Sequence, residues 1–235
     1  MNILVCNDDG IDSHGIAKLA EIAGNIGDVY VVAPSGQRSA VSHGITIGKD
    51  ITVWSVPFPV TVKEAFSVEG TPADCVRVGV NCLLPVKPDI ILSGINYGYN
   101  LGFDTLYSGT VGAAREGNSY GIKAFAISME QGADDTIVDI YLLDLLKSLI
   151  NEEINEGELW NINFPDCKLE EVKGIKRCEP ASHSFFNETF IKTHVNDSEY
   201  KVRIEGSLRK GGNDNTDIKA ISDNYITVSI IKSFY

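Results

Sequence analysis

The chain has little positive charge. Of its 235 residues, 20 are Lys or Arg and 32 are Asp or Glu, which gives a net charge of −12. Proteins that coat nucleic acids or bind anionic membrane surfaces carry a basic face, so we expect neither a nucleic-acid polymer nor a membrane as a partner. A small phosphorylated ligand stays compatible with this charge, because a bound divalent cation can reverse the local sign.

The sequence also lacks the cysteine patterns of disulfide-bonded and zinc proteins. Its five cysteines are odd in number, form no C-x-x-C pair and lie in no His or Cys cluster with zinc spacing. This usage is typical of a reducing compartment. No apolar stretch is long enough to span a membrane, and Met1 leads directly into a strand-like run rather than a signal peptide. We therefore expect a cytoplasmic protein.

Three motifs of well-known enzyme classes are absent. No G-x-G-x-x-G follows the first predicted strand, which disfavours a dinucleotide cofactor. No G-x-S-x-G is present, which disfavours a serine hydrolase of the α/β type. The segment GITIGKD (44–50) is one residue shorter than a phosphate-binding P-loop and has no Ser or Thr after Lys49.

Strand-like and helix-like segments alternate through the first two thirds of the chain. Apolar runs at 2–6, 28–34, 89–94, 123–128 and 159–165 are typical of parallel strands that are covered on both faces. Amphipathic segments lie between most of them. This order predicts an α/β fold with a mostly parallel sheet and helices on both of its faces.

The alternation ends near residue 166. The segments 173–195, 199–208 and 224–234 have the composition of β-strands joined by polar loops. We therefore expect two parts: residues 1–165 as the α/β domain and residues 166–235 as a β-rich extension of hairpins. The extension is predicted to serve in oligomerisation, and its last strand to return to the core.

Polar residues follow three predicted strands at their carboxyl ends, where ligands bind in open parallel sheets. Asp8 and Asp9 follow the first strand, Ser39 lies after the second, and Asn96 lies after DIILSG (89–94). Adjacent carboxylates repel each other unless a cation neutralises them, and Mg²⁺ and Mn²⁺ prefer oxygen ligands. These four residues are the predicted ligands of one divalent cation. The alternative is that the aspartates only cap the next helix.

The segment YSGTVGAAREG (107–117) has the features of a phosphate-binding turn. Gly109 permits close backbone approach, Ser108 and Thr110 supply hydroxyl groups, and the helix predicted to follow presents free N–H groups. Asn100, in the polar loop just before, is a further candidate for phosphate binding. Ser-Gly-Thr also forms ordinary capped turns, and that alternative stays open.

Five motifs in residues 2–128 occur in an order that resembles the SurE (survival protein E) family. They are ILVCNDDGIDSHGI, APSGQRSAVSHGITI, EGTPADCVRVGV, PDIILSGINYGYNLGFDTLYSGTVGAAREG and GIKAFAIS. LWNINFP and TDIKAISDNYITVSII are similar to later parts of the family pattern. The resemblance implies a three-layer α/β/α sandwich with a Rossmann-like sheet, and it assigns the metal to Asp8, Asp9, Ser39 and Asn96.

The same resemblance implies a function and an assembly. Family members are metal-dependent phosphatases that hydrolyse nucleoside 5′- and 3′-monophosphates, and short polyphosphate is a further candidate substrate. They form homodimers, sometimes paired into tetramers, in which the C-terminal extension is exchanged. IKRCEPASHSFFNETF (175–190) matches no family motif. The chain also ends soon after its last strand, so an exchanged C-terminal helix is predicted to be missing.

The expected catalytic residues are Asp8 and Asp9, either of which could accept a proton from the attacking water. Direct attack by Asp8 on phosphorus is a second option. Phosphatases with an aspartyl nucleophile separate their two Asp by one residue, which disfavours this option here without removing it. Two other classes of function stay open: a metal-dependent nucleotide-binding module without turnover, and a structural protein in which the aspartates are helix caps.

Overall fold

The computed structural model describes residues 1–208 and 215–233. Its main sheet runs in the order β3-β4-β2-β1-β5-β6-β7-β11-β8. The bounds of these strands are β1 (Asn2–Cys6), β2 (Asp28–Pro34), β3 (Val53–Ser55), β4 (Glu64–Val68), β5 (Ile90–Tyr97), β6 (Lys123–Met129), β7 (Glu158–Phe164), β8 (Ile175–Arg177) and β11 (Ile226–Lys232).

The central strands are parallel, as the continuous apolar runs predicted. β1 pairs with β2 on one side and with β5 on the other, and β4, β6 and β7 continue the sheet in the same direction. The chain moves outward from β1 first to one side and then to the other. The carboxyl end of β1 is therefore the point at which the strand order reverses, where open α/β sheets bind their ligands.

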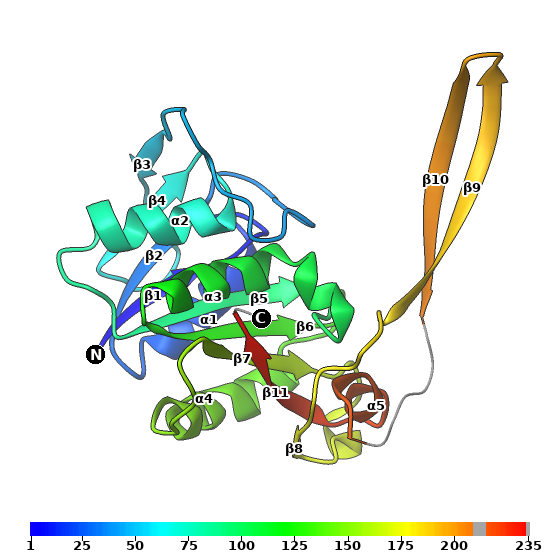
Figure 1. Ribbon diagram of the computed structural model, residues 1–235. Helices are drawn as coiled ribbons and strands as arrows, with labels where there is room; N and C mark the ends of the chain where they lie inside the picture. The colour runs from blue at the N-terminus through cyan, green and yellow to red at the C-terminus, as the bar shows by residue number, and fades with distance from the viewer. Residues whose placement is uncertain (209–214, 234–235) are drawn as a thin grey trace.

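Two apolar cores lie on opposite faces of this sheet. The helices are α1 (His14–Ala23), α2 (Pro72–Val78), α3 (Gly109–Ser119) and α4 (Thr136–Ile150). Side chains of α1 and α4 pack in one core, and side chains of α2 and α3 pack in the other. Figure 1 shows the helices on both sides of the strands, which confirms the three-layer α/β/α arrangement.

Helix starts follow the capping chemistry of the sequence. The Ser13 hydroxyl accepts a hydrogen bond from the backbone N–H of Ile16 at the start of α1. Thr71 caps α2 and forms a reciprocal pair of hydrogen bonds with Asp74, with Pro72 in the first turn. In the part of the chain that the structure describes, no helix is long and apolar enough to cross a membrane.

The C-terminal segment contains a hairpin that stands away from the sheet. β9 (Phe186–Asn196) and β10 (Glu199–Leu208) pair only with each other in an antiparallel ribbon, and Figure 1 shows this ribbon projecting from the body. A short helix that was not predicted, α5 (Asp217–Ser222), follows. β11 then returns to the main sheet, antiparallel to β7.

Asp217 joins the C-terminal segment to the body. It is fully buried, and its carboxylate accepts hydrogen bonds from the backbone N–H groups of Gly102 and Ala181, each at 2.9 Å, and of Ile218 at 2.8 Å. Burial raises the pKa of this carboxyl group, and the three hydrogen bonds oppose that shift. One side chain therefore satisfies backbone donors from three separate segments.

Replacing Asp217 by Ala should leave these three buried donors without an acceptor. Each unsatisfied buried donor costs about 1–3 kcal/mol, so we expect the free energy of unfolding to fall by about 3 kcal/mol or more. Urea denaturation at a fixed protein concentration measures the change. Asp223→Ala is the control, because Asp223 lies in the same segment but is only partly buried and pairs with the Lys219 side chain instead of buried backbone donors. A loss below about 1 kcal/mol for Asp217→Ala would show that these hydrogen bonds contribute little.

Candidate active site

Asp8 and Asp9 lie directly after β1, at the carboxyl edge of the sheet. Asp8 is only 4% exposed, whereas Asp9 is half-buried. Asn7 shapes the turn that carries them. Its side-chain amide donates to the carbonyl oxygen of Gly10 at 2.9 Å and to the Ser13 hydroxyl at 2.8 Å. The turn is therefore tied to the cap of α1, which fixes where the two carboxylates point.

The start of α3 lies against Asp8. The Thr110 hydroxyl donates to Asp8 Oδ1 at 2.5 Å. A Cβ atom added to Gly109 would lie 2.9 Å from Asp8 Cβ and 3.0 Å from its Oδ2, so this position has room only for glycine. The Ser108 hydroxyl accepts from Val111 N–H at 3.1 Å and caps the helix. Ser108 therefore caps α3, and at the same turn the backbone of Gly109 comes close to the Asp8 carboxylate.

The loop after β2 reaches the same place. The backbone N–H of Arg38 donates to the carbonyl oxygen of Asp8 at 2.6 Å, and the Gln37 amide donates weakly to Asp9 Oδ1 at 3.4 Å. Ser39, the next residue, is exposed to solvent. Ser39 therefore directly follows Arg38, whose backbone N–H contacts Asp8.

The end of β5 completes the convergence. The backbone N–H of Tyr97 lies 3.5 Å from Asp9 Oδ2. Its neighbour Asn96 is half-buried, and its amide nitrogen donates to the carbonyl oxygen of Gly98 at 2.7 Å. The amide oxygen of Asn96 is then the atom that can bind a cation. The carboxyl ends of β1, β2 and β5 meet here, as their order in the sheet requires.

Asn100 lies in a buried polar cluster with residues of β6 and β7. Its side-chain amide donates to the Ser128 hydroxyl at 2.8 Å, and its backbone N–H donates to Asn163 Oδ1 at 2.8 Å. Its carbonyl oxygen accepts from the amides of Asn161 and Asn163. Asn100 therefore anchors the loop after β5, and one N–H of its side-chain amide is already engaged.

Sequence reasoning did not assign a role to this cluster. Asn161 and Asn163 are fully buried in β7. Their signal in the sequence is the alternation within LWNINFP, where two amides interrupt an otherwise apolar strand. Buried amides of this kind need partners, and the loop backbone around Asn100 supplies them.

The two carboxylates have perturbed acidities. Burial raises the pKa of Asp8 to about 6, with the hydrogen bond from Thr110 opposing the shift and the charge of Asp9 adding to it. Burial also raises the pKa of Asp9, against the hydrogen bonds from Tyr97 and Gln37. A site that raises the pKa of two adjacent carboxyl groups favours a bound cation, whose charge would lower both again.

The donor set at this point suits a hard cation. In the part of the chain that is described, no three His, Cys, Asp or Glu side chains gather closely enough to hold a metal ion. A cation here would therefore rely on Asp8 and Asp9 together with hydroxyl and amide oxygens. These all-oxygen ligands are the kind that Mg²⁺ and Mn²⁺ accept.

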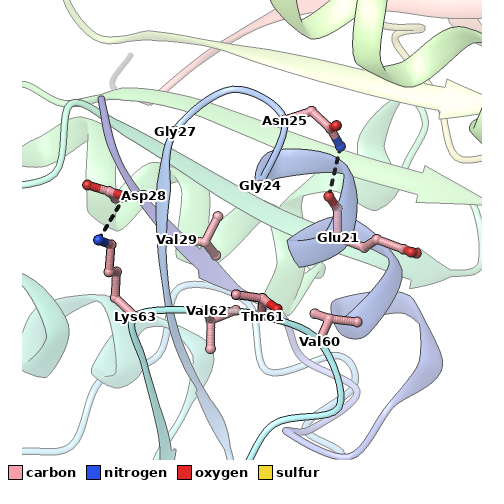
Figure 2. Close-up of a pocket in the computed structure, with 10 residues that line it drawn as sticks. All are labelled: Glu21, Gly24, Asn25, Gly27, Asp28, Val29, Val60, Thr61, Val62 and Lys63. Atoms are coloured by element: carbon pink, nitrogen blue, oxygen red, sulfur yellow. Dashed lines mark hydrogen bonds and ion pairs between the residues drawn. The ribbon is translucent and has the colours of Figure 1, made fainter.

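A cavity of about 710 Å³ lies elsewhere, at the amino end of β2. Figure 2 shows its lining, with Lys63 paired to Asp28 at 3.1 Å and the Asn25 amide bonded to the carbonyl oxygen of Glu21. This cavity is at the edge of the sheet opposite Asp8, and the Lys63–Asp28 pair in its lining is exposed to solvent. The converging carboxylates, rather than the size of a cavity, identify the candidate site.

Comparisons with known proteins point to one family. The family model described as Survival protein SurE matches residues 3–187. A 5′-nucleotidase SurE of Clostridium botulinum (strain 657 / Type Ba4) is 42% identical over 233 residues, covering 97% of this chain and 92% of the relative. The 5′-nucleotidase SurE of Thermoanaerobacter sp. (strain X514) is 38% identical over 234 residues, which are 98% of this chain and 92% of the relative.

The fold agrees with these matches. The crystal structure of the SurE protein from Aquifex aeolicus superimposes with a TM-score of 0.86 at 33% sequence identity, covering 100% of this chain and 94% of that one. The family model covers the segments that carry Asp8, Ser39, Asn96 and Thr110. On sequence and on structure, the chain belongs to the SurE family.

Proposed function

We propose that the chain is a metal-dependent nucleotidase that hydrolyses nucleoside 5′-monophosphates to nucleoside and phosphate. The observation that carries this proposal is the buried Asp8 carboxylate, which lies beside Asp9 and is held by Thr110 at the start of α3. Several relatives that match along nearly the whole chain are named 5′-nucleotidase SurE. Nucleoside 3′-monophosphates and short polyphosphate are further proposed substrates.

One divalent cation per subunit, Mg²⁺ or Mn²⁺, is the proposed cofactor. Its ligands would be the carboxylates of Asp8 and Asp9, the hydroxyl of Ser39 and the amide oxygen of Asn96. When bound, such a cation supplies charge neutralisation at the phosphate and lowers the pKa of a coordinated water. The raised pKa of Asp8, about 6, supports this assignment because burial makes its negative charge costly and a bound cation would offset that cost.

The phosphate would lie at the N-terminus of α3. The first N–H groups of a helix and its dipole favour an anion. Ser108, Gly109 and Thr110 are the proposed binding residues, and the absence of a side chain at Gly109 lets the backbone come within contact of Asp8. Asn100 is the fourth proposed residue, and its backbone contacts would hold the loop that leads to this turn.

Asp9 is the better placed general base of the two proposed catalytic aspartates. It is half-buried, so a water molecule can approach it, whereas Asp8 Oδ1 accepts the short hydrogen bond from Thr110. Phosphate monoesters hydrolyse very slowly without a catalyst, so positioning and charge neutralisation must supply most of the acceleration. Attack by Asp8 on phosphorus is the second mechanism, and it predicts a phospho-enzyme.

We also propose that the chain forms a homodimer through the β9–β10 hairpin, with a tetramer as a further assembly. Cross-strand pairing places Phe190 opposite Ile204, and Val202 follows on the same face. These side chains are 62%, 58% and 57% exposed. A two-stranded hairpin is marginally stable alone, so an apolar face on it favours cover by a second copy.

A cytoplasmic location is part of the proposal. All five cysteines are free, which suits a reducing compartment. The rival function is a nucleotide-binding module on the same fold, which would bind nucleotide with the metal but release no phosphate.

Phosphate release should depend on a divalent cation. We expect the purified protein to release phosphate from a panel of nucleoside monophosphates, to stop in EDTA and to recover when Mg²⁺ or Mn²⁺ is restored. Asp9→Asn should lower kcat/KM on the order of a hundredfold or more, because a charged group at the reacting centre is lost. A malachite-green assay of released phosphate measures both effects.

Asp12→Asn is the matched control for that variant, because Asp12 is an exposed carboxylate in the same loop. It should keep the wild-type rate. No phosphate release with any cation, together with tight nucleotide binding, would favour the binding module instead.

Disrupting the apolar face of the hairpin should separate the subunits. Phe190→Glu introduces a charge at the centre of that face, so we expect sedimentation as a monomer at concentrations where the wild type is a dimer. Thr193→Glu, on the opposite face of the same strand, should leave the dimer intact. A monomeric wild type, or a Phe190→Glu dimer, would show that the hairpin is not the interface.

A further inference from the structure

The loop between β5 and α3 has proposed site residues at both of its ends. Asn96 lies at the end of β5, and Ser108–Thr110 begin α3. The middle of this loop forms one 3₁₀ turn, Phe103–Leu106. Pairing of β5 with β6 holds the Asn96 end, so the way this turn is held bears mainly on the start of α3.

The turn is bound to residues that lead into the β9–β10 hairpin, and Asp104 makes the main contacts. Its carboxylate accepts a hydrogen bond from the Ser184 hydroxyl at 2.5 Å and another from the Phe185 N–H at 2.8 Å. Beside it, the backbone N–H of Phe103 donates to the carbonyl oxygen of His183 at 3.2 Å. Three hydrogen bonds thus join the turn to residues 183–185.

Apolar packing reinforces this junction. Leu101 packs with Ala181, Phe185 and Ile218 in a small core of its own, apart from the two cores of the main sheet. The Phe185 ring contacts the ring of Phe186, the first residue of β9, edge to face at 5.3 Å between centroids. The contact therefore continues from the turn into the base of the hairpin.

The same turn also holds the loop that carries Ser39. The backbone N–H of Ser42 donates to the carbonyl oxygen of Tyr107 at 2.9 Å, and its hydroxyl donates to the carbonyl oxygen of Leu106 at 2.6 Å. The Tyr107 N–H in turn donates to the carbonyl oxygen of Asp104 at 3.1 Å. From Asp104, a short chain of hydrogen bonds leads to the Ser39 loop, and the backbone leads directly to Ser108.

We propose that Asp104 is a positioning residue for the reaction. It fixes the 3₁₀ turn against residues 183–185, and the turn then sets both the phosphate-binding residues and the loop of Ser39. The Asp104 carboxylate bonds to Ser184 and Phe185 rather than to the proposed metal ligands, so its effect is indirect. This inference rests on the proposed nucleotidase function, and it adds that the C-terminal segment supports the active site directly.

Three variants test the proposal. Asp104→Ala removes both acceptor oxygens. Asp104→Asn keeps the shape, because its amide oxygen can accept from Phe185 N–H and its amide nitrogen can donate to Ser184. Ser184→Ala removes one hydrogen bond from the other side and leaves the carboxylate in place. Asp223→Ala is the control, because Asp223 directly follows α5 and its side chain pairs with Lys219 rather than with the turn.

The readouts are KM and kcat for a nucleoside monophosphate, inhibition by inorganic phosphate, and the melting temperature. We expect Asp104→Ala to raise KM and the phosphate inhibition constant about tenfold, the scale of a lost charged hydrogen bond, and Ser184→Ala to raise them about threefold. Asp104→Asn should restore most of the affinity, and Asp223→Ala should match the wild type. Unchanged KM and phosphate inhibition in Asp104→Ala and Ser184→Ala, even with a lower melting temperature, would overturn the proposal.

Hydrogen exchange separates this test from the test of function. In Asp104→Ala the amides of residues 105–112 and of Ser42 should exchange faster, whereas in Asp223→Ala they should not. If the wild type released no phosphate but this exchange pattern appeared, the nucleotidase function would fail and the mechanical link would stand. Exchange equal to that of the wild type at these amides would refute the link itself.

Discussion

The short hydrogen bond from Thr110 to Asp8 is the interaction on which the rest of the site depends. Asp8 is buried and lies next to a second carboxylate, so its charge is costly. The Thr110 hydroxyl stabilises that charge in part, and it holds the start of α3 against the end of β1. Burial nonetheless keeps the pKa of Asp8 raised, at about 6, so a nearby positive charge would stabilise this carboxylate.

That hydrogen bond needs the whole sheet order to form. β1 lies between β2 and β5 and is parallel to both, so the segments that follow these three strands all begin at one edge of the sheet. Gly109 then permits contact that any side chain would prevent, and Asn7 fixes the turn of the two aspartates. The fold brings the ends of these three strands together, and a few small or polar residues fix the positions of the two carboxylates there.

Many strands and helix starts of this fold, and the candidate site residues, were predictable from the sequence because they depend on local chemistry. Apolar runs gave the parallel strands, Ser13 and Thr71 gave helix starts, and the residues after three strands gave the candidate ligands. The buried cluster of Asn100 was not predictable, because its partners on β6 and β7 are far away in sequence. The helix α5 was missed for a related reason.

α5 has only six residues and little periodicity, and its position depends on the buried carboxylate of Asp217. The helix propensity of these few residues gives no information about such a long-range contact. The same limit applies to the junction at Asp104, where a polar loop residue is held by Ser184, eighty positions further along the chain. The sequence indicates which groups could do chemistry, whereas the structure shows what holds them in place.

The most direct test of the cation site is a crystal structure of the protein soaked in Mn²⁺, with anomalous scattering used to locate the ion. The arrangement of ligands predicts one anomalous peak per subunit within bonding distance of the Asp8 and Asp9 carboxylates, with oxygen atoms of Ser39 and Asn96 completing the shell. A fully occupied peak elsewhere, with Asp8 and Asp9 bound only to Thr110, Tyr97 and Gln37, would contradict the central claim.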